Sequence, residues 1–258
     1  MPKIHPLANV HRDAQLADDV EVGAFTVIGE HVKIGAGTVI GPHVVLTGHT
    51  TLGENNRVFQ FASIGEISQD KKYQGEKVTT TIGDNNTFRE YVSVHAGTVQ
   101  DRGDTLIGNG NLILAYTHVA HDCVLGNNIV ISNTVQLAGH VHVEDYVVMG
   151  GLCGIHQFCR IGAHAMVGGG SMLVQDVPPY VTVSGYPAKP VTINSEGLKR
   201  RGFTSETIMS LKRAYKTLYR NGLSLSAAID QLRADAENEP ALLALVTFLE
   251  VEGRGIAR

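Results

Sequence analysis

Two histidines and an aspartate stand close together in the segment THVAHDCVLG, residues 117–126. His118 and His121 are three residues apart, and Asp122 directly follows His121. Side chains of these types can act as metal ligands, as a general base with a carboxylate that orients it, or as solvated surface groups. The spacing alone does not choose among these uses, so the choice depends on the elements that hold the three residues.

An aliphatic or aromatic residue recurs every six positions through most of the chain. The series runs from Ile4 to Ile64, from Ile82 to Val94, and from Ile107 to Leu173. A period of six is the signature of a parallel β-helix, in which each repeat supplies one short strand and one corner. Three repeats form a coil of 18 residues, and neighbouring coils stack about 4.8 Å apart. The sequence therefore predicts a mainly β fold built on a parallel β-helix.

The cysteines follow the same period. The position four residues after each aliphatic residue is usually small, and Cys123, Cys153 and Cys159 all occupy it. We interpret them as buried core residues rather than as nucleophiles or ligands. Their odd number and the absence of a CxxC pair indicate a reducing compartment without a disulfide framework.

Two polar segments interrupt the repeat, at about residues 65–81 and 96–106, and we expect each to leave the coil as a loop. The repeat ends where Pro178 and Pro179 remove ladder hydrogen bonds. Beyond about residue 190, apolar residues recur at the three- and four-residue intervals of helices. We therefore expect a β-helix over residues 1–190 and a C-terminal α-helical domain over residues 191–258.

Composition limits the partners of the chain. A net charge of −4 gives no argument for nucleic acid as a partner. We find neither an apolar run of the roughly 18 residues that a membrane span needs nor a signal peptide, which predicts a cytoplasmic protein.

The segment from residue 196 to residue 220 is basic, with seven cationic residues and only two acidic ones. This segment suggests an acidic partner or a phosphate, although a solvated helix face also fits it.

The period places distant polar residues on neighbouring coils. Residues 18 apart should stack, so His121 stacks with Gly139, and Gly139 with Gln157. In the next column, Asp122 stacks with His140. The loops should not disturb this order if each leaves the coil whole.

With both loops set aside, Val94 aligns with Val119, which brings His95 onto the same face. The residues that converge there, beside the roots of both loops, are His95, His118, His121, His140, His156 and Gln157. A single histidine at an outward corner is usually only solvated, and His31 and His49 also stack without a loop nearby. The loops and the neighbouring aspartate favour a functional site for the larger set.

Acyl transfer is the chemistry that fits these residues. It needs a base for the acceptor hydroxyl, a group that orients the base, and a donor for the oxyanion. His121 can be the base, and Asp122 or a backbone carbonyl can fix its tautomer. Gly139, one rung away at roughly 5 Å, has no side chain to cover its N–H. Lys72, in the first loop, either binds a phosphate-bearing group or is simply solvated.

The chain resembles, over essentially its whole length, the hexapeptide-repeat family of UDP-N-acetylglucosamine O-acyltransferases, which open lipid A biosynthesis. The resemblance rests on QFASIGEISQDKKYQGE (60–76), HVAHDCVLGN (118–127), LAGHVHV (137–143), IHQFCRIGAH (155–164), DVPPYV (176–181) and NSEGLKRRGF (194–203). It implies a left-handed β-helix and a homotrimer with active sites between subunits. It also implies direct transfer of an (R)-3-hydroxyacyl chain from acyl carrier protein to the 3-hydroxyl of the sugar, with no metal and no cofactor.

The resemblance also assigns roles to residues. The family's base corresponds to His121, its orienting carboxylate to Asp122, and its oxyanion donor to the backbone of Gly139. The positions that contact substrate correspond to Asp70, Lys72, His118, His140, His156 and Gln157. Those that hold the nucleotide sugar from the neighbouring subunit correspond to Asn194, Glu196, Arg200 and Arg201. Gly169 corresponds to the floor of the acyl pocket, which suggests a chain of roughly twelve to fourteen carbons.

Three other functions remain open at this point. The related glucosamine N-acyltransferase carries a domain before its repeats, and we take the start of the repeat at Ile4 to leave no room for one. A zinc carbonic anhydrase on the same fold would recruit His118, His121 and His140 as ligands. A non-catalytic trimeric scaffold would need none of these residues.

Overall fold

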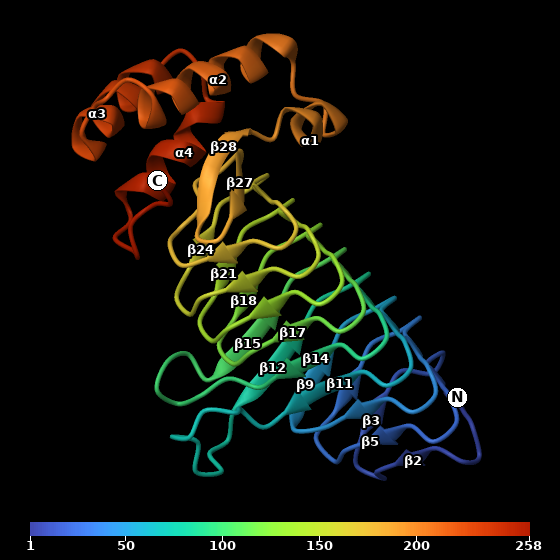
Figure 1. Ribbon diagram of the computed structural model, residues 1–258. Helices are drawn as coiled ribbons and strands as arrows, with labels where there is room; N and C mark the ends of the chain where they lie inside the picture. The colour runs from blue at the N-terminus through green and yellow to red at the C-terminus, as the bar shows by residue number, and fades with distance from the viewer.

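The computed structural model describes residues 1–258, and its main body is a long parallel β-helix that carries a group of helices at its C-terminal end (Figure 1). Three sheets form the sides of the β-helix, and each coil contributes one strand to each sheet. Most strands are two residues long, as expected when a corner follows every hexad.

Sheet A contains β1 (Lys3–Ile4), β4 (Glu21–Val22), β7 (Val39–Ile40), β10 (Arg57–Val58), β13 (Thr87–Phe88), β16 (Leu112–Ile113), β19 (Val130–Ile131), β22 (Val148–Met149), β25 (Met166–Val167), β27 (Val181–Gly185) and β28 (Ala188–Ile193). Sheet B contains β2 (Asn9–Val10), β5 (Val27–Ile28), β8 (Val45–Leu46), β11 (Ser63–Glu66), β14 (Ser93–His95), β17 (His118–Val119), β20 (Gln136–Leu137), β23 (Gly154–Ile155) and β26 (Met172–Leu173). Sheet C contains β3 (Gln15–Leu16), β6 (Lys33–Ile34), β9 (His49–Leu52), β12 (Thr79–Ile82), β15 (Asp104–Ile107), β18 (Val124–Leu125), β21 (His142–Val143) and β24 (Arg160–Ile161).

The register of the strands follows the predicted coils. In undisturbed coils the partners are 18 residues apart, as in the pairing of Ile107 with Leu125. Across the loops, Ile64 pairs with Val94, and Val94 pairs with Val119. Both loops therefore leave the coil whole, and the predicted alignment of His95 with the later coils is confirmed.

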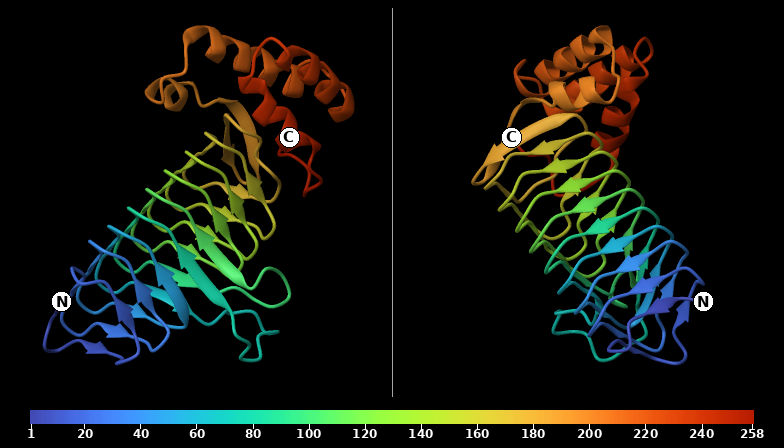
Figure 2. Two further views of the ribbon diagram at one scale, coloured as in Figure 1. Left: turned by 180° about the vertical axis from the view of Figure 1, so that it is seen from behind. Right: turned by 90° about the vertical axis from the view of Figure 1, so that its right-hand side faces the viewer.

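The two loops leave the β-helix at one edge, where sheet B gives way to sheet C. The first loop, residues 67–78, joins β11 to β12, and the second loop, residues 96–103, joins β14 to β15. Both project from the same side of the body (Figure 2). Because the coil continues unchanged after each, the loops add side chains to this edge without moving the strands around it.

The interior of the coils is a single apolar core of 41 buried residues. The predicted burial of the cysteines is confirmed, since Cys123, Cys153 and Cys159 are each at most 1% exposed. Burial raises the pKa of the Cys123 thiol, and likewise that of Cys159, to about 12. These thiols are therefore protonated and lie away from the outer face where substrates can bind.

A short ladder of asparagines runs inside this core. Asn56, Asn86 and Asn111 are at most 1% exposed and lie on successive coils. The side chain of Asn86 accepts from the Asn111 N–H at 2.9 Å and donates to the Gly108 carbonyl at 2.9 Å. Each amide thus satisfies backbone groups at the corners that the two-residue strands leave unpaired.

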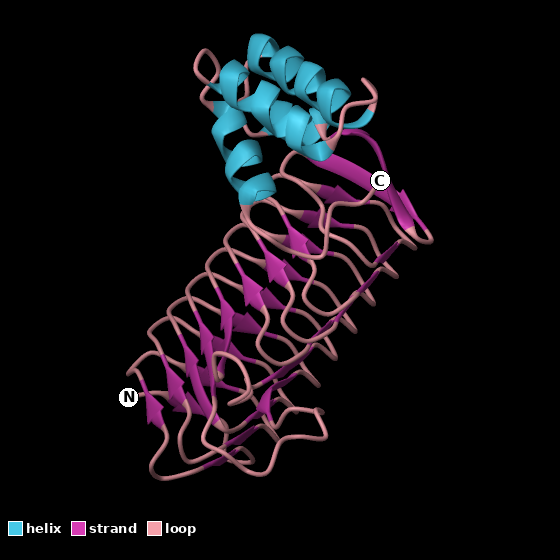
Figure 3. Cartoon of the chain, turned by 90° about the vertical axis from the view of Figure 1, so that its left-hand side faces the viewer, coloured by secondary structure: helices cyan, strands magenta, loops and turns pink.

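The C-terminal helices stand on the last coil (Figure 3). The antiparallel pair β27–β28 closes sheet A, and the chain continues into α1 (Ser195–Arg200), α2 (Ser205–Tyr219), α3 (Leu225–Ala236) and α4 (Ala241–Glu250). These helices have a second core of 15 buried residues. The domain division between residues 190 and 191 stays a prediction, and β28 runs across it.

Side chains cap the first three helices. Asn194 begins α1, Thr204 begins α2 and Ser224 begins α3, each accepting a hydrogen bond from an N–H of the first turn. The four helices have between 6 and 15 residues, and none is long and apolar enough to cross a membrane.

The asparagine ladder allows a test of this core. The variant Asn86→Ala would leave the buried Asn111 N–H and the half-buried Gly108 carbonyl without partners, which should lower the free energy of unfolding by about 3 kcal/mol. Urea denaturation followed by circular dichroism measures the change. Asn133, an exposed corner residue, supplies the control variant Asn133→Ala, which should unfold at the midpoint of the unmodified protein. Equal midpoints for all three proteins would contradict a stabilising role of the ladder.

Candidate active site

An open groove with a volume of about 840 Å³ runs along the outer face of sheet B, beside the root of the first loop. The floor of the groove extends from one coil to the next. The residues His118, Gln136, Gly154 and Met172 pair in register on successive coils and form part of this floor. Seven of the predicted site residues line this groove: Asp70, Lys72, His95, His118, His121, His156 and Gln157. The repeat therefore brings most of the predicted set together, as the spacing indicated.

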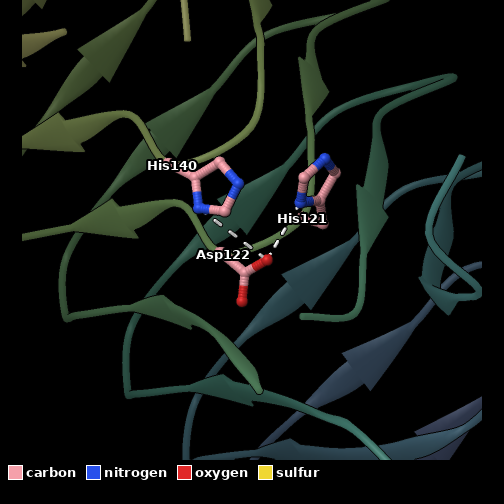
Figure 4. Close-up of side chains that lie close together, drawn as sticks. All are labelled: His121, Asp122 and His140. Carbon is pink, nitrogen blue, oxygen red and sulfur yellow. Dashed lines mark hydrogen bonds and ion pairs between the residues drawn. The ribbon is translucent and has the colours of Figure 1, made fainter. Parts of the chain in front are cut away.

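His121 and Asp122 form a hydrogen-bonded pair at the edge of this groove. The Nδ1 atom of His121 lies 2.9 Å from Oδ2 of Asp122, whose side chain is fully buried. The other ring nitrogen, Nε2, points away from the carboxylate (Figure 4). A neutral imidazole that donates through Nδ1 has its lone pair on Nε2, which is the arrangement a general base needs.

The Asp122 carboxylate is held in its ionised form. Burial by itself raises the pKa of this carboxyl, but hydrogen bonds from His121 and from Thr98 outweigh burial and bring the pKa below its ordinary value. Thr98 donates from its N–H at 2.9 Å and from its hydroxyl at 2.6 Å. An aspartate that stays charged next to His121 can stabilise the imidazolium that forms when His121 takes a proton.

Gly139 lies directly under the His121 ring. A Cβ atom placed on Gly139 would lie 2.5 Å from Cε1 and 2.6 Å from Nε2 of His121. Any other residue at this position would therefore displace the imidazole. The sequence suggested open space above the Gly139 N–H. In the structure the His121 ring occupies the space where a side chain of residue 139 would stand, and Gly139 itself is buried. Its N–H makes no hydrogen bond within the chain, as at the equivalent corner residue Gln157.

His118 is a neutral histidine on the floor of the groove. Its Nδ1 lies 2.8 Å from the Ser93 hydroxyl. Burial, followed by the neighbouring His95 and His121, lowers the pKa of His118 to about 4. His95 is also buried and meets His118 edge to face at 4.8 Å, with an Nδ1 atom that has no partner in the chain. Both rings can thus offer uncharged hydrogen-bonding atoms to a ligand.

His140 lies behind His121 and does not line the groove. Its ring meets His121 edge to face at 4.9 Å and stacks on Phe158 at 4.3 Å. Its Nδ1 lies 2.6 Å from Oδ2 of Asp101, in the second loop, and 4.0 Å from Oδ2 of Asp122. The predicted stacking of Asp122 and His140 on neighbouring coils thus brings their side chains to within 4.0 Å of each other.

Within one chain, His118, His121 and His140, which the carbonic anhydrase alternative would recruit, do not converge on one point. The potential ligand atoms that lie within 4.8 Å of one another belong to His121, Asp122 and His140, and His118 is not among them. Asp122 Oδ2 already accepts hydrogen bonds from Thr98 and His121. The donor set is therefore that of a hydrogen-bonded dyad rather than of three convergent imidazoles.

The remaining predicted residues lie outside the groove. Asn194 uses its amide to cap α1 and to donate to the His164 carbonyl at 2.9 Å. Glu196 is paired with Lys199 at 2.8 Å, and the Arg201 guanidinium lies 4.6 Å from the ring centre of Tyr146. The last two residues, Arg200 and Gly169, are exposed.

Several residues near the site were not found from the sequence, and four of them come from β14, the second loop and the last hairpin. Thr98 and Asp101 bind Asp122 and His140, Ser93 binds His118, and Tyr186 reaches the groove from the β27–β28 hairpin. Ser93 carried a usable signal, because it precedes Val94 and so occupies the column of His118. The loop and hairpin residues carried none, since the period of six does not extend to them.

Comparisons with known proteins agree with one another. A family model described as Udp N-acetylglucosamine O-acyltransferase, Domain 2, matches residues 176–257, and one described as Bacterial transferase hexapeptide (six repeats) matches residues 13–48 and 104–139. An acyl-(acyl-carrier-protein)–UDP-N-acetylglucosamine O-acyltransferase of Herminiimonas arsenicoxydans is 56% identical over 262 residues, with 100% of both chains covered. The enzyme of that name from Thiobacillus denitrificans is 54% identical over 258 residues, also with 100% of both chains covered.

Solved structures give the same result. The UDP-N-acetylglucosamine O-acyltransferase of Moraxella catarrhalis is 44% identical, covers 99% of both chains and superposes with a TM-score of 0.97. This likeness extends over coils and helices alike, so the β-helix is left-handed, as the resemblance implied. With relatives matched over its full length, the chain belongs to the family of acyl-(acyl-carrier-protein)–UDP-N-acetylglucosamine O-acyltransferases.

Proposed function

We propose that this enzyme transfers an (R)-3-hydroxyacyl chain from acyl carrier protein to the 3-hydroxyl of UDP-N-acetylglucosamine, the step that opens lipid A biosynthesis. The observation that carries the proposal is the His121–Asp122 pair, whose free ring nitrogen points away from a buried, ionised carboxylate at the edge of a long groove. The names of the full-length relatives supply the two substrates.

In the proposed reaction, Nε2 of His121 takes the proton of the sugar 3-hydroxyl, and the oxygen of this hydroxyl attacks the thioester carbonyl. The Asp122 carboxylate stabilises the resulting imidazolium. The Gly139 N–H, which has no partner in the chain, donates to the oxyanion of the tetrahedral intermediate. When the intermediate collapses, the thiolate of the carrier leaves and takes the proton back from His121. The acyl group passes directly to the sugar, in accordance with the burial of all three cysteines.

The groove residues have proposed roles in holding the substrates. Asp70 and Lys72 of the first loop, with His118, His156 and Gln157, line the space in which the acyl donor and sugar meet. His95 adds an uncharged ring beside His118. We assign His140 to substrate contact as well, although within one chain it lies behind His121 and its Nδ1 is held by Asp101.

We further propose that the enzyme works as a homotrimer in the cytoplasm. Asn194, Glu196, Arg200 and Arg201 lie off the groove of their own chain, so they would hold the nucleotide sugar in the groove of a neighbouring subunit. A basic segment over residues 196–220 suits the acidic acyl carrier protein. Both statements rest on these positions and charges together with the resemblance to the family.

The general base can be tested with a product assay. Purified protein is incubated with UDP-N-acetylglucosamine and a panel of 3-hydroxyacyl carrier proteins in the presence of a chelator, and acylated sugar is measured by mass spectrometry. His121→Ala should lower the rate by about a hundredfold or more, because the acceptor hydroxyl loses its base.

His31 offers the matched control, because it stacks with another histidine, His49, at 4.2 Å and does not line the groove. His31→Ala should retain the full rate. Product from none of the donors would reject the proposed function, whereas full activity in His121→Ala would keep the function and reject His121 as its base. Metal bound to the purified protein would support the zinc alternative, whereas activity in the presence of the chelator would reject it.

The proposed acyl-pocket floor predicts a change of substrate preference. Gly169 is exposed, and a Cβ atom there would meet only the backbone of Gly151, at 3.3 Å and beyond. Gly169→Met should therefore fold normally and shift the preferred acyl chain to a shorter one, since each excluded methylene forfeits about 0.8 kcal/mol. Competition between carrier proteins of different chain length measures the shift. An unchanged preference would remove Gly169 from the acyl pocket.

A further inference from the structure

The second loop, residues 96–103, has a buried root and an exposed tip. The residues from His95 to Thr98 are buried, while those from Val99 to Arg102 are mostly exposed. The Thr98 carbonyl accepts the N–H groups of Asp101 at 3.2 Å and of Gly103 at 3.0 Å, which closes the loop on itself. Thr98 is thus fixed by a turn at the point where the chain leaves the coil.

Thr98 donates a hydrogen bond to each oxygen of the Asp122 carboxylate. Its N–H donates to Oδ1 at 2.9 Å, and its hydroxyl donates to Oδ2 at 2.6 Å. The same Oδ2 accepts the Nδ1–H of His121. The Asp122 N–H in turn donates to the Thr105 hydroxyl at 2.9 Å. The plane of the carboxylate, and with it the direction of the hydrogen bond to His121, is therefore set by a residue 24 positions away.

A second contact joins the same loop to the neighbouring histidine. Asp101 lies 2.6 Å from Nδ1 of His140, and the His140 ring meets His121 edge to face at 4.9 Å. The loop therefore reaches both histidines of this corner, one through Asp122 and one directly. Residues of such an outer layer fix the tautomer and orientation of the groups that react.

We propose that the second loop is the positioning element of the acid–base centre, with Thr98 fixing the Asp122 carboxylate that orients His121 and Asp101 fixing the adjoining His140 ring. The proposal rests on the proposed function of His121 as general base. Thr98 is buried, does not line the groove and hydrogen-bonds Asp122 rather than His121, so it would act through Asp122. Its hydroxyl donates a hydrogen bond to a buried charge, which is among the stronger kinds in proteins.

The kinetic test compares three variants. Thr98→Val has nearly the same shape as threonine and keeps the backbone N–H bond to Asp122, but removes the hydroxyl. It should lower kcat by about ten- to a hundredfold and change KM by less than about threefold, as expected when an interaction of the transition state is lost. Thr98→Ser restores the hydroxyl and should bring kcat back to within about threefold of the unmodified enzyme.

Thr81→Val is the matched control. Thr81 donates its hydroxyl to Asp104 at 3.2 Å, at the other root of the same loop, and does not contact Asp122. The same chemical change there should leave kcat within about twofold, because it removes no hydrogen bond to the buried charge. A kcat of Thr98→Val equal to that of Thr81→Val would overturn the proposal.

A double-mutant cycle separates positioning from a general structural role. If Thr98 acts through Asp122, then Thr98→Val should cost almost nothing in a protein that already carries Asp122→Asn. Equal costs in both backgrounds would show that Thr98 acts independently of Asp122 and would overturn the proposal.

Proton NMR of the His121 ring tests the positioning without any reaction. The Nδ1 proton that His121 donates to Asp122 is assigned by its loss in His121→Ala. Its resonance should move or broaden in Thr98→Val and recover in Thr98→Ser. A resonance unchanged by Thr98→Val would overturn the proposal. A changed resonance in a protein that makes no acylated sugar would support the positioning while rejecting the proposed function.

Discussion

The site depends on the parallel backbone ladder that fixes each coil above the one before it. A rung of this ladder is the pairing of Val94 with Val119, which sets residues of two coils side by side although a loop separates them in the chain. Because side chains alternate between the two faces of a strand, a slip of one residue would turn His118 inward and Val119 outward. The position of every histidine in the groove therefore follows from the same constraint that builds the core.

The ladder also explains how an irregular segment can place a side chain accurately. The second loop leaves the coil after β14 and returns at β15, and both ends are hydrogen-bonded strands of neighbouring sheets. Thr98 lies three residues beyond the end of β14. Only a short stretch of chain therefore separates its hydrogen bond with Asp122 from the hydrogen-bonded strand. Loops carry function on many scaffolds, and this loop gains its accuracy from the coil to which both of its ends belong.

Most of the site was predictable because it obeys the period. The stacking of His121 over Gly139, the nearness of Asp122 to His140, and the placing of His95 beside His118 all follow from counting 18 residues and setting two loops aside. The burial of the cysteines follows from the same count. What could not be predicted lies where the period stops, as with Thr98, Asp101 and Tyr186, whose positions depend on loop conformation.

A second group of features that the sequence could not predict concerns the direction of side chains rather than their position. The sequence placed Gly139 correctly on the rung beside His121 but could not show that the imidazole would lie over it. It also could not show that the amide of Asn194 is used to begin α1. A rung fixes a Cα atom, whereas the rotamer of a side chain depends on partners from other segments.

The same dependence gives the neighbouring histidines different chemical states. His118 is held neutral by burial, with a pKa of about 4, and its hydrogen-bond partner is a serine hydroxyl. His121, only three residues away, faces the Asp122 carboxylate, whose pKa is brought below its ordinary value by hydrogen bonds from His121 and from Thr98. An ionised carboxylate can stabilise the imidazolium that a general base forms, whereas burial opposes protonation of His118. Two histidines of one coil thus have different partners, a serine hydroxyl for His118 and a carboxylate for His121, and the second loop contributes Thr98 to the second environment.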